Sequence, residues 1–67
     1  MKFQEALTAL DNGKKVTRTD DTWENYFLAV SEEYGGLTLF STVDGWCDTQ
    51  HPVNARDLIA NDWEIVP

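Results

Sequence analysis

The sequence predicts an α+β fold in which one N-terminal helix packs on an antiparallel sheet of four to five strands. Three observations lead to this expectation. The N-terminal segment has apolar residues at helical spacing, several later segments are short and rich in β-branched and aromatic residues, and turn-forming pairs separate them. With 67 residues, the chain is expected to form a single small domain spanning residues 1–67.

The predicted helix covers about residues 3–12, followed at residues 15–18 by a short strand. Asn12-Gly13 ends the helical pattern, because glycine readily adopts the left-handed conformation that terminates helices. In the strand, Val16 and Arg18 are two residues apart and therefore share one face. The apolar face of the helix is expected to consist of Phe3, Ala6, Leu7 and Leu10.

Two further strands are expected in the middle of the chain. Residues 26–30 are apolar throughout, which is typical of a strand that is covered on both faces or lies in an interface. Gly35-Gly36 indicates a turn, and residues 37–43 form the next predicted strand. Asp44-Gly45 is a pair typical of a two-residue hairpin loop.

The C-terminal part is expected to contain a loop, a short helix and a closing strand. Residues 47–53 lack a regular pattern and are predicted as loop. Asn54 has the position of an N-cap, with Asp57 three residues later as in a capping box, so residues 55–60 are predicted to form one or two helical turns. Trp63 and Ile65 alternate with acidic residues, which indicates a final strand.

Composition excludes several classes of protein. One cysteine cannot form an internal disulfide, and the chain has no cysteine and histidine set for a structural zinc site. No apolar run approaches 18 residues and no signal segment opens the sequence, so we expect neither a membrane association nor a secretory precursor. A large catalytic domain does not fit in this length.

The charge of −7 is unevenly distributed. Residues 1–18 hold four basic and two acidic residues, a net +2, whereas residues 19–67 hold ten acidic residues and one arginine, a net −9. Repulsion from phosphates argues against direct nucleic-acid binding. Two interpretations remain: the acidic residues keep a small protein soluble, or an acidic face binds a basic partner.

No pattern for catalysis or metal binding stands out. Cys47 and His51 are four residues apart in a predicted loop, without an orienting acid. Asp20, Asp21 and Glu24 lack the glycine turn and the closing glutamate of a calcium loop. We therefore expect no catalytic residues, no bound metal, no cofactor and no enzyme activity.

The aromatic residues offer better candidates for binding. Trp63, in the predicted closing strand, is expected in the core. Trp23 follows a polar loop and stands near Arg18, so its ring is a candidate platform for a nucleobase, with the arginine binding a phosphate.

Two stretches resemble a group of small phage proteins, the second Thoeris anti-defence family, whose members capture cyclic nucleotide immune signals. Residues 3–18, FQEALTALDNGKKVTR, are similar to the opening of these proteins, and residues 57–66, DLIANDWEIV, are similar to their closing signature. Together these stretches cover 26 of the 67 residues. One departure is that Thr-Asp-Asp-Thr separates Arg18 from Trp23, where the family usually has Gly-Trp almost directly after the arginine.

The resemblance implies a non-enzymatic phage counter-defence protein that sequesters a cyclic nucleotide second messenger in the cytoplasm of the bacterial host. It also implies a homo-oligomer with ligand pockets at subunit contacts. The ligand-binding candidates at motif positions are Arg18, Trp23, Asn61 and Asp62. The alternative hypothesis is an acidic inhibitor, a nucleic-acid mimic of the anti-CRISPR kind, that binds a basic surface of a host defence protein.

Overall fold

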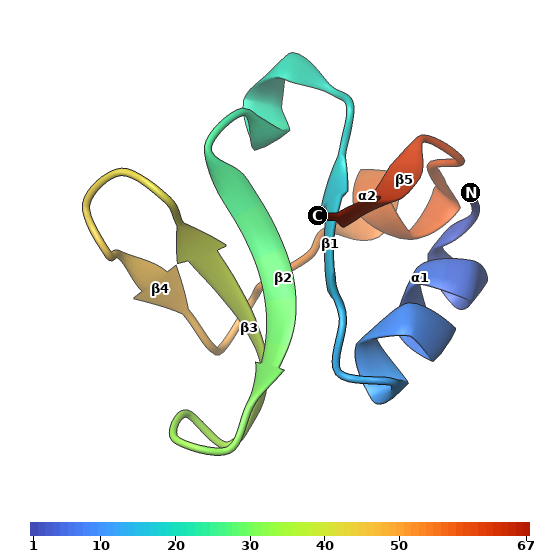
Figure 1. Ribbon diagram of the computed structural model, residues 1–67. Helices are drawn as coiled ribbons and strands as arrows, with labels where there is room; N and C mark the ends of the chain where they lie inside the picture. The colour runs from blue at the N-terminus through green and yellow to red at the C-terminus, as the bar shows by residue number, and fades with distance from the viewer.

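The computed structural model describes all residues from 1 to 67 and confirms the α+β prediction. A nine-residue helix, α1 (Phe3–Asp11), accompanies a five-stranded antiparallel sheet with the strand order β4-β3-β2-β1-β5 (Figure 1). A 3₁₀ turn, η1 (Asp21–Trp23), links β1 to β2, and a short helix, α2 (Ala55–Ile59), precedes β5. The strands are β1 (Lys15–Arg18), β2 (Tyr26–Ser31), β3 (Gly36–Ser41), β4 (Cys47–Asp48) and β5 (Trp63–Val66).

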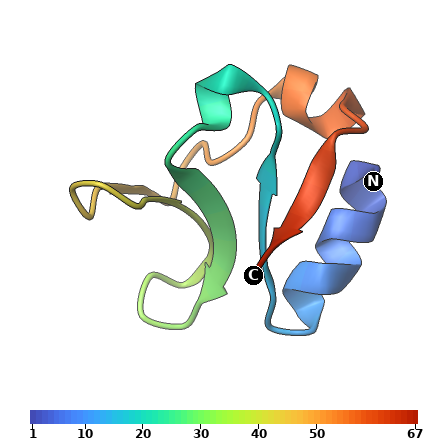
Figure 2. The same ribbon diagram turned by 45° about the horizontal axis from the view of Figure 1, so that its top comes forward.

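Helix α1 packs on one face of the sheet, beside β1 and β5 (Figure 2). Its buried side chains are Ala6, Ala9 and Leu10. The predicted apolar face is thus wrong in one position, because Leu7 is 45% exposed and Ala9 is buried instead. The helix ends as predicted, with Asn12 as its C-cap and Gly13 at a φ of 79°.

The core lies between α1 and the middle of the sheet. Val16 pairs with Leu28, and Leu28 pairs with Leu39, so these three side chains point to the same face. Trp63 is 2% exposed, which confirms its predicted place in the core. Its ring centroid lies 5.1 Å from that of Phe3 and 5.0 Å from that of Trp23.

The opposite face of the sheet carries no helix and is aromatic. Phe27 and Phe40 pair across β2 and β3 and stack with 5.3 Å between their ring centroids. Tyr34 meets Phe40 edge-on, and the Nζ atom of Lys15 lies 5.0 Å from the centroid of Phe27. The residues of β2 are therefore covered by α1 on one face only, which leaves the second face for solvent or for a partner.

The loop between β3 and β4 is longer than predicted. Strand β3 ends at Ser41, and the backbone N–H of Ser41 donates to the carbonyl of Trp46 at 2.8 Å. The residues between these two form the loop, so the prediction of a two-residue hairpin loop at Asp44-Gly45 is wrong. Side-chain bonds stabilise the wider loop instead: Asp44 accepts a hydrogen bond from the N–H of Trp46 at 3.0 Å. Beyond it, Cys47–Asp48 pairs with β3 as a short strand where loop was predicted.

The C-terminal predictions are confirmed in outline. Asn54 caps α2 through its side chain, which accepts a hydrogen bond from the N–H of Asp57 at 3.1 Å. The carboxylate of Asp57 accepts one in return from the N–H of Asn54 at 2.8 Å, which completes the capping box. Strand β5 follows and pairs with β1 at the edge of the sheet. Neither helix is long and apolar enough to cross a membrane.

Candidate functional site

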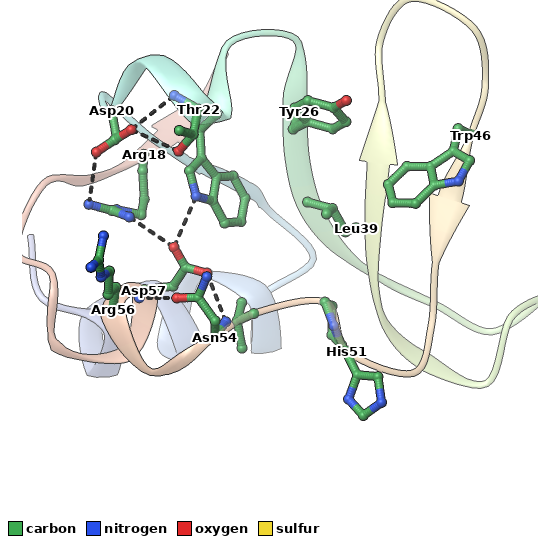
Figure 3. Close-up of a pocket in the computed structure, with 13 residues that line it drawn as sticks. Arg18, Asp20, Thr22, Tyr26, Leu39, Trp46, His51, Asn54, Arg56 and Asp57 are labelled. Carbon is green, nitrogen blue, oxygen red and sulfur yellow. Dashed lines mark hydrogen bonds and ion pairs between the residues drawn. The ribbon is translucent and has the colours of Figure 1, made fainter.

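A cavity of about 520 Å³ lies between two parts of the chain that are distant in sequence (Figure 3). One side is formed by η1 and the segment that enters α2. The other side comes from β2, β3 and the loop before β4. The site therefore exists only when the sheet has assembled.

One wall of the cavity is aromatic. Tyr26 and Trp46 face each other edge-on, with 6.2 Å between ring centroids, and Leu39 lies beside them. Trp46 is 50% exposed, so much of its ring is available for contact. Flat, partly exposed aromatic surfaces of this kind bind planar ligands such as nucleobases.

The facing wall is polar and contains an unpaired cation. Arg56 is exposed and forms no ion pair with any carboxylate of the chain. In Figure 3 the guanidinium of Arg18 is drawn between Arg56 and Asp20. The pKa of Asp20 is lowered from its ordinary value, first because its carboxylate accepts a hydrogen bond from the backbone N–H of Thr22.

Arg18 also borders the cavity, but its guanidinium is bound by carboxylates. Its Nε donates to Asp62 at 2.8 Å and its Nη1 donates to Asp57 at 2.8 Å. Its Nη2 lies 3.6 Å from Asp20. The bonds to Asp62 and Asp57 raise the pKa of Arg18, with the hydrogen bond to Asp62 as the largest cause, and the same hydrogen bond from Arg18 lowers the pKa of Asp62.

Trp23 forms the back of the cavity. It is 7% exposed, its ring lies edge-on to Trp63, and its Nε1 donates to the carboxylate of Asp57 at 3.0 Å. Trp23 therefore presents only a small part of its surface to a ligand. Most of its contacts are with the core.

Comparison with known proteins identifies the family of the chain. A family model described as the Thoeris anti-defense 2-like domain, Tad2-like, matches residues 1–66. The chain belongs to the Tad2-like family. Neither the comparison with curated proteins nor that with solved structures finds a significant match. Membership covers nearly the whole chain and assigns this Tad2-like protein a role against Thoeris defence.

Of the four residues that the sequence suggested for ligand binding in this Tad2-like chain, two border the cavity. Arg18 and Trp23 line it, whereas Asn61 and Asp62 do not. Asn61 is exposed between α2 and β5. Asp62 binds Arg18 and accepts a hydrogen bond from the hydroxyl of Thr19 at 3.2 Å.

Sequence reasoning missed the more accessible residues of the cavity. Trp46 and Arg56 were singled out neither by motif nor by spacing, although both are types that bind nucleotides. The sequence does place Arg56 directly before a capping residue and Trp46 directly after a turn, where side chains are commonly exposed.

His51 lies at the rim with its ring pointing away from the cavity (Figure 3), and Cys47 is not part of the lining. No group of three His, Cys, Asp or Glu side chains is arranged to hold a metal ion.

Proposed function

We propose that this Tad2-like protein binds a cyclic nucleotide immune signal in the cavity and withholds it from its effector in the bacterial cytoplasm. The observation that carries the proposal is the pairing of an exposed aromatic wall with an unpaired arginine across one cavity of about 520 Å³. A nucleotide needs both features, because its base is flat and aromatic and its phosphate is anionic.

The base is expected to lie against Trp46 and Tyr26. Stacking of a base on an aromatic side chain contributes about 1–3 kcal/mol and depends little on which base is bound. Trp46 has half of its surface exposed, so stacking on it requires no rearrangement of the core. Trp23, which is buried, would contribute the floor of the site.

The phosphate is expected to bind Arg56. A guanidinium binds phosphate through two parallel charge-assisted hydrogen bonds. Those donors are free in Arg56, whereas a phosphate at Arg18 would compete with Asp57 and Asp62 for donors already engaged at 2.8 Å. Arg18 would then shape the polar wall, while Arg56 provides the charge.

Capture of this kind is non-enzymatic. No bond in the signal has to break, since the effector is silenced when the free signal falls below the concentration that activates it. Potency then depends on the dissociation constant and on the abundance of the protein.

We also propose that the protein acts as a homo-oligomer. Its accessible surface is 4719 Å², against about 4,300 Å² expected for a folded monomer of this mass. The uncovered aromatic face of β2 and β3 supplies apolar surface for a second copy. Burial there would compensate for the small core, which contains seven buried hydrophobic residues.

The experiment has two parts. Purified protein should release an intact nucleotide on heat denaturation, and calorimetry with cyclic ADP-ribose isomers and cyclic dinucleotides should identify a ligand.

Arg56→Gln should then weaken binding of that ligand by about tenfold or more, as expected for loss of a charge-assisted contact. Lys14→Gln is the matched control, because it removes one positive charge at an exposed position outside this cavity. Equal affinity of the wild-type protein and Arg56→Gln would refute this assignment.

A second candidate function rests on the acidic surface. All the acidic residues that lie in turns and loops of the middle region are exposed: Asp20, Asp21, Glu24, Glu32, Glu33 and Asp44. An inhibitor that binds a basic host protein would use such a surface. The double variant Asp20→Asn, Asp21→Asn separates the two functions. Nucleotide capture should be unchanged or improved, whereas docking on a basic protein should be weakened.

A further inference from the structure

Helix α2 has little apolar packing to hold it in place. Leu58 is 50% exposed and Ile59 is 84% exposed, and the buried residue of the helix is Asp57, at 5% exposure. A helix of five residues is not stable by itself in water. The polar contacts of Asp57 therefore decide where α2 lies.

Asp57 bonds to three other elements at once. Its Oδ1 accepts hydrogen bonds from Nη1 of Arg18 in β1 at 2.8 Å and from Nε1 of Trp23 in η1 at 3.0 Å. Its backbone carbonyl accepts one from Nε1 of Trp63 in β5 at 2.9 Å. Its Oδ2 accepts from the N–H of Asn54 at 2.8 Å, so both carboxylate oxygens are engaged.

The same residue ends the segment that forms the polar wall of the cavity. Residues 51–54 and Arg56 line the cavity immediately before it. In Figure 3 the bonds from Arg18, Trp23 and Asn54 converge on Asp57, beside the Arg56 side chain. The position of Arg56 in the polar wall thus depends on the neighbouring carboxylate of Asp57, which is buried and lines the same cavity.

We propose that Asp57 is the positioning residue of this cavity: it ties α2 to β1, η1 and β5 and so holds Arg56 opposite Trp46. Asp57 also lines the cavity, but both of its carboxylate oxygens are engaged by donors of the protein. The part of this inference that concerns ligand affinity rests on the proposed function, whereas the part that concerns the placement of α2 does not.

Hydrogen exchange measured by NMR tests the placement of α2 without any ligand. Asp57→Asn keeps the shape of the side chain but removes its charge and one acceptor. The N–H groups of Leu58 and Ala60, which donate to Asn54 and Asp57 carbonyls, should exchange about tenfold faster or more in this variant. Amides of β2 and β3 should keep their rates. Unchanged exchange at Leu58 and Ala60 would overturn the proposal.

Asp62→Asn is the matched control. It removes another carboxylate that binds Arg18, but Asp62 lies outside α2 and makes no bond to that helix. Exchange at Leu58 and Ala60 should therefore stay within about twofold of the wild-type rate, because their own partners remain. Equal acceleration in both variants would mean that the charge balance at Arg18, and not Asp57, places the helix.

The indole N–H resonances give a second readout that a general loss of stability would not produce. In Asp57→Asn the resonance of Trp23 should shift, because its acceptor changes, while that of Trp46 should not.

If Asp57→Asn fails to fold, hydrogen exchange in the wild-type protein tests the placement of α2 instead. The amides of Leu58 and Ala60 and the indole of Trp23 should then give the same free energy of opening, after correction for the intrinsic exchange rate of each group, since one opening exposes all three. Exchange of α2 with the Trp23 indole still protected would overturn the proposal.

The ligand arm uses calorimetry with whichever cyclic ADP-ribose isomer or cyclic dinucleotide the wild-type protein binds. Asp57→Asn should weaken binding by about tenfold, and should add little to the loss in an Arg56→Gln background, because both changes remove the same contact. Unchanged affinity in a variant with a released α2 would refute the positioning role. If the wild-type protein binds none of these probes, the proposed function fails, and the exchange data still decide the placement of α2.

Discussion

Trp63 shows how one side chain supports several elements. Its ring packs between Phe3 and Trp23, and its indole N–H donates to the backbone carbonyl of Asp57 at 2.9 Å. Its loss would leave a cavity in the core and would remove one of the two hydrogen bonds that the Asp57 carbonyl accepts, the other coming from the N–H of Ala60.

Trp63→Ala should therefore unfold the protein rather than selectively impair binding. Truncation of a buried aromatic residue costs about 3–5 kcal/mol, which is a large part of the stability of a small domain. Thermal and urea denaturation followed by circular dichroism measure this loss. The control is Trp46→Ala, which removes a half-exposed ring and should change the melting temperature little. A Trp63→Ala protein that melts like the wild type would contradict the assignment of Trp63 to the core.

Asp62 gives a pH-dependent contribution to stability. Its pKa in the folded protein is lowered, mainly by the hydrogen bond from Arg18, relative to about 3.9 in an unfolded chain. The stabilisation is therefore present above the unfolded pKa and is lost as the pH falls through the folded pKa.

Denaturation midpoints measured between pH 7 and pH 2.5 should fall on acidification, and they should fall less steeply in Asp62→Asn than in the wild-type protein. Asp48→Asn is the control, because Asp48 has no ion pair with a basic side chain. A profile for Asp62→Asn that runs parallel to that of the wild type would exclude this contribution.

At the level of elements, the turn after α1 depends on one backbone conformation. Gly13 has a φ of 79°, which side chains with a Cβ rarely adopt, although no atom of the protein lies within 4 Å of where that Cβ would stand. The cost of a substitution there is thus conformational and not steric.

Gly13→Ala should destabilise the protein by about 1–2 kcal/mol, the cost of the left-handed conformation for an ordinary residue. Gly13→Asn should cost less, because asparagine tolerates this conformation better. Urea denaturation of both variants measures the difference. Equal stability of Gly13→Ala and the wild-type protein would show that the turn can adopt another conformation at no cost.

Elements with a local signal were predicted well. Helix α1 and its glycine stop, strands β1, β2 and β5, and the Asn54–Asp57 capping box follow from spacing within a few residues. Strand β4 did not, because two residues carry no periodicity and pair only because β3 lies beside them.

For the whole molecule, the uncovered aromatic face leads to a prediction about assembly. The protein should sediment as a homo-oligomer at micromolar concentration, because the stacked Phe27 and Phe40 rings lie on a face without a helix. Phe40→Glu should shift the equilibrium toward the 7.6 kDa monomer by placing a charge in that face. Circular dichroism establishes that the variant is folded.

Val43→Glu is the control for this experiment. Val43 is 74% exposed in the loop between β3 and β4, so a charge there should leave the sedimentation unchanged. A wild-type protein that remains a well-folded monomer at every concentration would refute the oligomer prediction.

The sequence by itself determined the fold class, the Tad2-like resemblance and the place of Trp63 in the core, since each depends on residue type and local spacing. Only the tertiary structure decided which residues are free to bind. Arg18 and Arg56 are the same type of residue, yet Arg18 is neutralised by carboxylates from the N-cap of η1, from α2 and from the segment before β5, while Arg56 is unpaired. That distinction depends on contacts between residues up to 44 positions apart, which no local pattern encodes.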